Sequence, residues 1–139
     1  IRILRNLDNF SKLTSIESNK KFAEIAKEHV KISGLSKNHE LLIGKTTQII
    51  PTLDEKFDFI FIDHWKDLYL EDLKMLERKK LIKHNAWIFA DNVILFNLED
   101  YLGYVRSSPN YQSKFISTKR EYSKSHPDGI EISIFKDEI

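Results

Sequence analysis

Cysteine is absent from the 139-residue sequence, and glycine and proline are scarce. The lack of cysteine excludes a disulfide framework, a zinc–thiolate site and a thiol nucleophile. The four glycines are too scattered to form a glycine-rich loop of the kind that cradles phosphate groups. Any binding or catalytic chemistry therefore falls to oxygen and nitrogen side chains.

Charge and the length of the apolar runs exclude two further classes of partner. The 22 basic and 21 acidic residues give a net charge of +1, so nothing attracts the chain globally to nucleic acid or to an anionic membrane. No apolar run approaches the roughly 20 residues that cross a bilayer. We therefore expect no nucleic-acid partner, no membrane segment within this chain, and a cytoplasmic location. Because the chain begins with Ile1 rather than methionine, we expect further residues before it. Attachment to a membrane through such residues is left open as an alternative.

Hydrophobic patterning alternates between strand and helix spacing along the chain. Strands are expected at residues 13–17, 40–43, 57–62, 86–90, 113–122 and 130–135. The run at 57–62 is almost uniformly apolar, which is typical of a strand that is covered on both faces. The order of elements predicts an α/β fold in a single domain, residues 1–139, with an open, mostly parallel sheet, helices on both faces and an antiparallel last strand.

Helix boundaries are predicted from capping residues. Asn19 suits the start of a helix that runs from Lys20, and Gly34 suits its left-handed exit. Thr46 or Thr47 is expected to cap a short second helix. Further expectations are an amphipathic helix over 67–81, a helix capped by Asn97, and a turn at 127–129.

Three of the predicted strands end on an acid: Glu17, Asp63 and Asp91. Open α/β sheets bind ligands at the carboxyl ends of their strands, so we expect these acids to face one crevice. An acid after a strand is commonly a cap or a turn residue, and Asp91-Asn92 is also a common turn dipeptide. Two carboxylates and an amide oxygen, from Asp63, Asp91 and Asn92, nevertheless suit a hard cation such as Mg²⁺, and we favour that interpretation.

Neighbouring residues admit both functional and structural interpretations. Glu17 suits the ribose hydroxyls of a bound nucleoside, although an exposed glutamate before a helix is common. Lys66, three residues after Asp63, suits a general base because a nearby divalent cation destabilises its ammonium form. Trp65 is either a core residue or a wall for a planar ligand, and His64 is a metal ligand or a hydrogen-bonding neighbour.

Several short segments resemble the catechol O-methyltransferase family of S-adenosylmethionine-dependent enzymes. The most specific is Ile62-Asp63-His64-Trp65-Lys66-Asp67, which is similar to the metal-site segment of that family. The other matching segments, in the same order along the chain, are residues 44–51 (GKTTQIIP), 90–94 (ADNVI), 104–106 (YVR), 120–122 (REY) and 128–129 (DG). The resemblance covers essentially the whole chain and implies a Rossmann-like methyltransferase sheet.

The resemblance also implies catalytic roles. Asp63, Asp91 and Asn92 match the Mg²⁺ ligands of the family. Lys66 matches the general base that deprotonates one catechol hydroxyl, and Glu121 matches the carboxylate that binds the other. In such an enzyme Mg²⁺ lowers the pKa of the attacking hydroxyl, and alignment of nucleophile and methyl group provides most of the rate gain.

Cofactor contacts are implied in the same way. Glu17 matches the acid on the ribose of S-adenosylmethionine. Ser18 stands where the family has a hydrophobic residue against the adenine. The positions that surround the adenosine in the family are Thr46, Thr47, His64 and Trp65, and the two threonines replace a serine and a glutamine. Asp63 is expected to contact the cofactor as well as the metal.

Two departures from the family pattern leave alternatives open. The first strand of the family and its glycine-containing turn are expected before Ile1, so residues 1–139 alone are expected to bind S-adenosylmethionine poorly. Phe96 stands where a proline usually borders the catechol, which favours keeping open another vicinal diol as the acceptor. A non-catalytic interaction protein that retains the fold is the third hypothesis.

Overall fold

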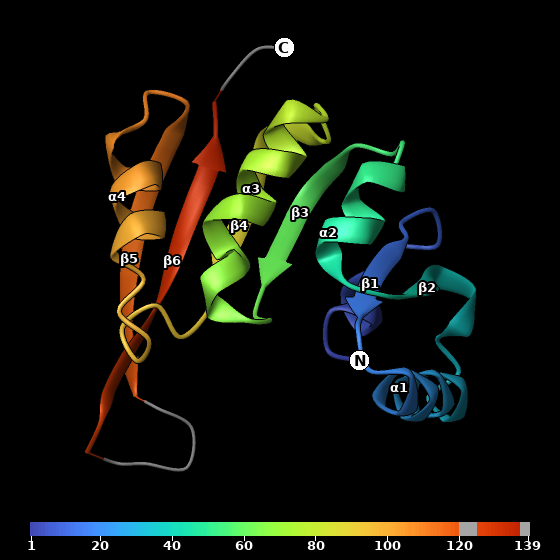
Figure 1. The fold of residues 1–139 in the computed structure, drawn as a ribbon. Coiled ribbons are helices and arrows are strands. Elements are labelled where there is room, and N and C mark those ends of the chain that lie inside the picture. Colours follow the sequence, from blue (N-terminus) through green and yellow to red (C-terminus); the bar gives the residue numbers. More distant parts are fainter. Residues whose placement is uncertain (120–124, 137–139) are drawn as a thin grey trace. The chain divides into compact units, whose positions relative to one another are not determined.

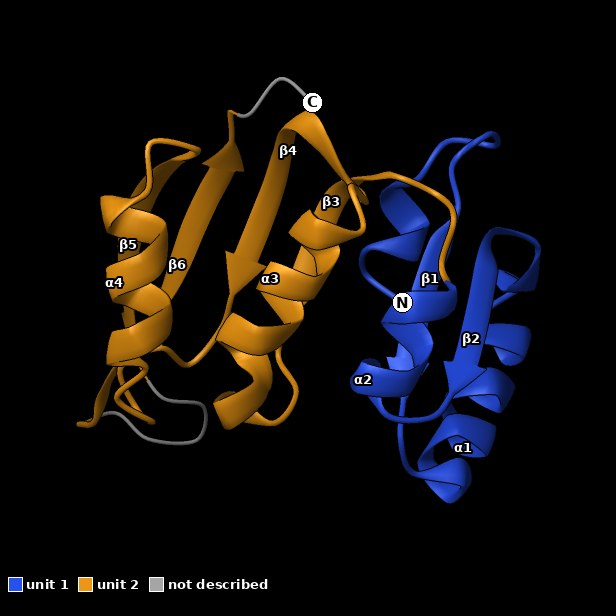
Figure 2. Cartoon of the chain, turned by 45° about the horizontal axis from the view of Figure 1, so that its top comes forward, with its two compact units in different colours: residues 1–52 blue, residues 53–139 orange. Residues whose placement is uncertain are grey.

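A computed structural model describes residues 1–119 and 125–136 and divides the chain into two compact units, residues 1–52 and 53–139 (Figure 2). Each unit has its own sheet (Figure 1). The prediction of one domain over residues 1–139 stays a prediction. Glu121 and the predicted end of the strand at 113–122 lie outside the described residues.

Unit 1, residues 1–52, consists of β1 (Leu13–Glu17), α1 (Lys20–Ile32), β2 (His39–Ile43) and α2 (Thr46–Ile49), with short 3-10 helices between them. The two strands are parallel, as predicted. Asn19 caps α1 by accepting hydrogen bonds from the amides of Lys21 and Phe22, and Gly34 leaves the helix with φ of 72°. The predicted boundaries of this helix are therefore confirmed.

The predicted cap of α2 is wrong. Both Thr46 and Thr47 lie inside the helix, and Lys45, whose backbone is extended, precedes it without a side-chain cap. A capping residue needs a non-helical backbone, which neither threonine has.

Unit 2, residues 53–139, carries a four-stranded sheet in the order β3-β4-β6-β5. Its elements are β3 (Phe57–Ile62), α3 (Tyr69–Arg78), β4 (Ile82–Ala90), α4 (Glu99–Ser107), β5 (Tyr111–Lys119) and β6 (Pro127–Phe135). β3 and β4 are parallel, whereas β6 is antiparallel to both β4 and β5. The α/β class and the antiparallel last strand are therefore confirmed.

Three local predictions in unit 2 are wrong. The turn predicted at 127–129 is the start of β6, where Gly129 pairs with Ser117 of β5. A Cβ atom at position 129 would run into the ring of Phe115, so the glycine serves close packing within the strand pair. Asn97 does not cap α4, which begins two residues later at Glu99. The helix predicted over 67–81 is shorter and ends at Arg78.

The two helices of unit 2 cover one face of its sheet (Figure 1). Tyr69 and Leu73 of α3 and Tyr101 of α4 are buried there, with the rings of the two tyrosines edge to face at a centroid distance of 5.8 Å. On β4, Ile88 and Ala90 point into the same core and are fully buried. This packing holds the ends of β3 and β4 in place beneath the site described below.

The opposite face of this sheet carries partly exposed aromatic side chains. Phe59 and Phe61 of β3 are 37% and 47% exposed, and Trp87 of β4 is 48% exposed. Among the described residues of unit 2, no helix lies on this face. The expectations of helices on both faces and of a strand covered on both sides concern the whole chain and stay predictions. Alternation along each strand directs these aromatic side chains away from α3 and α4.

Among the residues that the structure describes, every helix is too short or too polar to cross a bilayer.

Candidate active site

The carboxyl ends of β3 and β4 form the candidate site. Ile62 pairs with Ala90 at the last step of the parallel ladder, so Asp63 and Asp91 leave the sheet side by side. The Asp91 amide donates to the Ile62 carbonyl oxygen at 3.0 Å, which extends the pairing by one residue. The structure therefore places Asp63 and Asp91 next to each other, as the sequence predicted. Asn92 follows with φ of 57°, a left-handed backbone that asparagine tolerates better than most residues.

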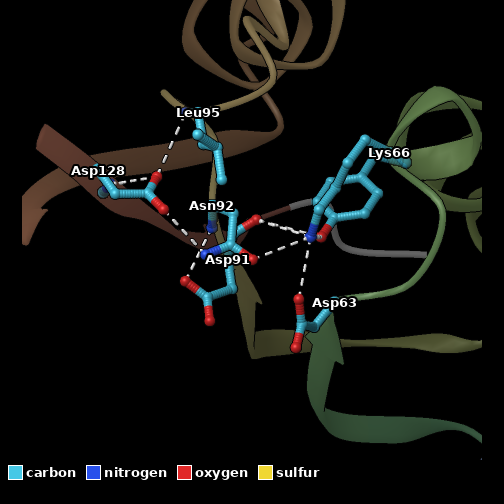
Figure 3. Close-up of polar contacts among 8 residues, drawn as sticks. Asp63, Lys66, Asp91, Asn92, Leu95 and Asp128 are labelled. Carbon is cyan, nitrogen blue, oxygen red and sulfur yellow. Dashed lines mark hydrogen bonds and ion pairs between the residues drawn. The ribbon is translucent and has the colours of Figure 1, made fainter. Parts of the chain in front are cut away.

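Lys66 is the centre of the polar contacts at this edge (Figure 3). Its Nζ lies 2.9 Å from Asp63 Oδ1 and 3.2 Å from Asn92 Oδ1. It also donates to the Tyr69 hydroxyl at 2.6 Å and approaches the Asp91 carbonyl oxygen at 3.5 Å. The Lys66 side chain is only 15% exposed, while that of Asp63 is 45% exposed. Four oxygens from two strand ends and one helix thus surround one cation, the lysine ammonium.

The Asp91 carboxylate takes a different direction. Its Oδ1 accepts a hydrogen bond from the Asn92 amide at 2.8 Å, and Figure 3 shows the carboxylate turned away from the Lys66 ammonium. The side-chain oxygens that converge on Lys66 therefore come from Asp63 and Asn92. Asp91 contributes only its backbone carbonyl oxygen to the surroundings of Lys66, and its carboxylate bonds to the Asn92 amide instead.

Tyr69, for which the sequence predicted no role, binds the Lys66 ammonium through its hydroxyl. Its hydroxyl accepts from Lys66 and donates to the Asp91 carbonyl oxygen at 3.1 Å. The tyrosine is fully buried, and burial, followed by the nearby carboxylates of Asp63 and Asp91, raises its pKa, so it stays a neutral donor. Its place at the first turn of an amphipathic helix signalled only a core residue.

Asp128 is the second residue at the site to which the sequence assigned no role. It is 2% exposed, and its Oδ2 accepts from Asn92 Nδ2 at 2.9 Å. Its Oδ1 accepts from the amides of Gly129 at 2.8 Å and Leu95 at 3.3 Å. Burial by itself raises the pKa of Asp128, but the hydrogen bonds from Asn92 and the backbone outweigh it and hold the pKa below its usual value. The sequence predicted a turn at this position and a segment that resembles the family, but no role for Asp128 itself.

The donor set suits a hard cation in its chemistry. Side-chain oxygens of Asp63 and Asn92 both contact the Lys66 ammonium, so a positive charge is favourable between them. The Asp91 carboxylate lies next to the Asn92 backbone amide. In the described part of the chain, no three histidine, cysteine, aspartate or glutamate side chains cluster closely enough to hold a metal ion. The predicted ligand set contains only two such residues, Asp63 and Asp91, because its third member is Asn92. The absence of a three-residue cluster therefore does not test it. Magnesium binding stays a prediction.

His64 and Trp65, which follow Asp63 directly, have local partners. His64 Nε2 lies 2.7 Å from Asp72 Oδ2, and the imidazole stacks on the Tyr69 ring at a centroid distance of 5.4 Å. Trp65 is 71% exposed, and its indole nitrogen donates to the Asp67 carboxylate at 3.1 Å. Contact of either residue with an adenosine stays a prediction.

The predicted cofactor residues of unit 1 lie at the ends of β1 and β2. Glu17 Oε1 accepts from the Asn19 amide at 2.7 Å, and the Glu17 carbonyl oxygen accepts from the Gly44 amide at 3.0 Å. Ser18 is exposed, and Thr47 is half-buried. In the described part of the chain, the buried Thr46 Oγ1 has no hydrogen-bond partner. The roles of these residues stay predictions, as does that of Glu121 outside the described residues.

A comparison with protein families decides the relationship. A family model described as O-methyltransferase matches residues 3–121, most of the chain. The chain belongs to the O-methyltransferase family. Catechol O-methyltransferase B of Danio rerio is 36% identical over 140 residues, which cover 97% of this chain and 53% of the relative. Catechol O-methyltransferase of Sus scrofa is 35% identical over 141 residues, covering 98% and 75% respectively.

Solved structures of this family share the fold. The O-methyltransferase TomG from Streptomyces achromogenes, in complex with S-adenosylmethionine, superposes with a TM-score of 0.87 at 22% identity, covering 97% of this chain and 66% of that one. The O-methyltransferase of Bacillus cereus, in complex with S-adenosylhomocysteine, gives 0.85 at 20% identity, covering 96% and 67%. The chain spans about half the length of most of the catechol O-methyltransferases that it matches.

Proposed function

We propose that the protein transfers the methyl group of S-adenosylmethionine to a hydroxyl of a catechol-type small molecule, with Mg²⁺ as a cofactor. The observation that carries the proposal is the position of Lys66, held between the Asp63 carboxylate and the Asn92 amide oxygen at two adjacent strand ends. The relatives named catechol O-methyltransferase favour this acceptor.

Lys66 is the proposed general base. It is bound on one side by Tyr69, which directs the amine toward the strand ends, and the small exposed fraction of its side chain limits competing water. A base placed within hydrogen-bond reach of the reacting hydroxyl contributes about 10²- to 10⁴-fold to such reactions. Asp63, Asp91 and Asn92 would hold Mg²⁺, which when bound acts as a Lewis acid on the acceptor hydroxyls.

The strand ends of unit 1 contribute residues to the proposed cofactor site. The Glu17 carboxylate is oriented by the Asn19 amide, and a carboxylate can accept hydrogen bonds from both hydroxyls of a ribose. Thr46 Oγ1, which has no hydrogen-bond partner among the described residues, offers a further polar group at the start of α2. Structural neighbours solved in complex with S-adenosylmethionine or S-adenosylhomocysteine support this cofactor.

Phe96 favours a second candidate acceptor. Its ring centroid lies 5.5 Å from Lys66 Nζ, and the residue is 53% exposed. An aromatic side chain beside the base restricts the shape of the molecule that can reach it. Another vicinal diol that fits against Phe96 is therefore the alternative substrate.

Methyl transfer to catechol tests the proposal directly. The assay uses the longest natural polypeptide that contains residues 1–139, with S-adenosylmethionine and with either Mg²⁺ or a chelator. We expect activity only with Mg²⁺, and a large loss in Asp91→Ala. The matched control is Asp58→Ala, which removes an exposed carboxylate that pairs with Lys83. Activity of Asp91→Ala without added metal would contradict the metal site, and absence of transfer to any vicinal diol would favour a non-catalytic protein.

A further inference from the structure

The Asn92 side-chain amide has two chemically different ends, and each has a partner that accepts only one of them. Oδ1 lies 3.2 Å from the Lys66 ammonium, which can only donate. Nδ2 lies 2.9 Å from Asp128 Oδ2, and an ionised carboxylate can only accept. Both neighbours therefore select the same orientation of the amide, with its oxygen toward the strand ends (Figure 3).

Asp128 is itself held from several sides. Its second oxygen accepts from the backbone amides of Gly129 and Leu95, and the residue is 2% exposed. The first bond comes from the start of β6 and the second from the segment that follows β4. A buried carboxylate with three donors has little freedom to move or to be replaced by water. Asp128 is therefore held in place by backbone groups that do not depend on Asn92.

We infer that Asp128 is a positioning residue, which determines that residue 92 presents an oxygen rather than an NH₂ group to the cation site. The consequence for metal binding rests on the proposed function, but the orientation of the amide does not. A residue that orients a metal ligand typically changes metal affinity by about 10- to 100-fold when it is replaced. No predicted role for Asp128 came from the sequence because its partner is 36 residues away.

The isosteric variant Asp128→Asn isolates this role. The new Oδ1 can still accept from the amides of Gly129 and Leu95, which leaves an NH₂ group in the place of Oδ2. Two NH₂ groups would then face each other, so the Asn92 amide would turn over and direct Nδ2 toward the cation site. The exchange variant Asp128→Asn/Asn92→Asp restores a donor–acceptor pair at the same net charge and leaves one carboxylate oxygen free to face the cation.

Two measurements on the longest natural polypeptide containing the chain test the inference. Nuclear magnetic resonance follows the Asn92 side-chain NH₂ signal, which is assigned by its loss in Asn92→Asp. Electron paramagnetic resonance measures the binding of Mn²⁺ alone. In Asp128→Asn we expect the NH₂ signal to lose the downfield shift of its bond to a carboxylate, and the Mn²⁺ dissociation constant to rise about 10- to 100-fold. We expect the exchange variant to recover most of the affinity.

A matched control separates orientation from charge and from folding. Asp58→Asn removes one exposed carboxylate, as Asp128→Asn does, and should leave both readouts unchanged. An unchanged Asn92 signal in Asp128→Asn would overturn the inference, and so would an exchange variant that binds Mn²⁺ as weakly as the single variant. If the unmodified protein binds no Mn²⁺, the metal part of the proposed function fails, and the resonance shift alone then decides the role of Asp128.

Discussion

The strand ends of the two units carry similar residues but connect them in different ways. At the end of β1 in unit 1, Glu17 bonds to the amide of Asn19, only two residues away. At the ends of β3 and β4 in unit 2, Asn92 links Lys66, 26 residues away, to Asp128, 36 residues away. The first arrangement is a local one, and the second joins three separate elements.

This difference bears on what each edge can do. A local bond orients one carboxylate but leaves its surroundings free to adapt to a ligand. A network across elements fixes several groups relative to one another, which is what proton transfer and metal coordination require. We therefore expect proton transfer and metal binding at the edge of unit 2, and a contribution of Glu17 to cofactor recognition at the edge of unit 1.

Removal of Lys66 should have the largest effect. For Lys66→Ala in the assay of methyl transfer to catechol, we expect kcat to fall about 100-fold or more because the general base is lost. Lys83→Ala is the control, since Lys83 is an exposed lysine that also pairs with an aspartate. An undiminished rate in Lys66→Ala would remove the base from the proposal and with it the main difference between the two edges.

Glu17→Gln should give a smaller and different loss. The amide oxygen of glutamine can still accept from the Asn19 amide, but the charge that strengthens bonds to ribose hydroxyls is gone. We expect the dissociation constant for S-adenosylmethionine, measured by isothermal titration, to rise about tenfold. Mn²⁺ affinity should stay the same, and a change in it would break the assignment of separate roles. Glu40→Gln on β2, where Glu40 pairs with Lys12, is the control.

The cap of α1 tests the local character of unit 1. Asn19→Ala removes the side chain that accepts from Lys21 and Phe22, and we expect the free energy of unfolding to fall by about 1 kcal/mol. Asn19→Ser keeps an oxygen at that position and should recover most of the loss. Urea denaturation measures both variants. Equal destabilisation by alanine and serine would indicate that the cap bond is not the source.

The smallest effect concerns a contact that crosses elements of unit 2. Tyr104 of α4 donates to Glu77 of α3 at 2.7 Å, and burial, followed by this hydrogen bond, raises its pKa from 10.0 to about 12. Below pH about 10 the residue is neutral in both folded and unfolded chains; above it, the unfolded chain ionises first. Stability should therefore fall as the pH rises from about 10 to about 12, and less so in Tyr104→Phe.

Urea denaturation between pH about 9 and 11 checks this expectation. The stabilities of the unmodified protein and of Tyr104→Phe should converge as the pH rises. Parallel pH profiles would show that Tyr104 titrates alike in the folded and unfolded chains. The contact with Glu77 would then contribute nothing that depends on pH.

Features that depend on neighbours in the sequence were predictable. The period of the apolar residues located β1 and β3 with their observed bounds, and Asn19 and Gly34 located the ends of α1. The meeting of Asp63 and Asp91 followed from a general property of parallel strands, whose carboxyl ends share one edge. The predicted helix caps at Thr46 and Asn97 were wrong because the type of a residue does not by itself decide where a helix begins.

The sequence by itself determined the α/β class, the strand-end acids and Lys66 as a candidate base. Only the tertiary structure decided that the Asp91 carboxylate turns away from Lys66 and that α3 and α4 of unit 2 lie on the same face of its sheet. It also decided that Asp128, at the start of a strand rather than in a turn, orients Asn92. The physical reason is that these features depend on side-chain directions and on partners far along the chain, which residue types and spacings do not specify.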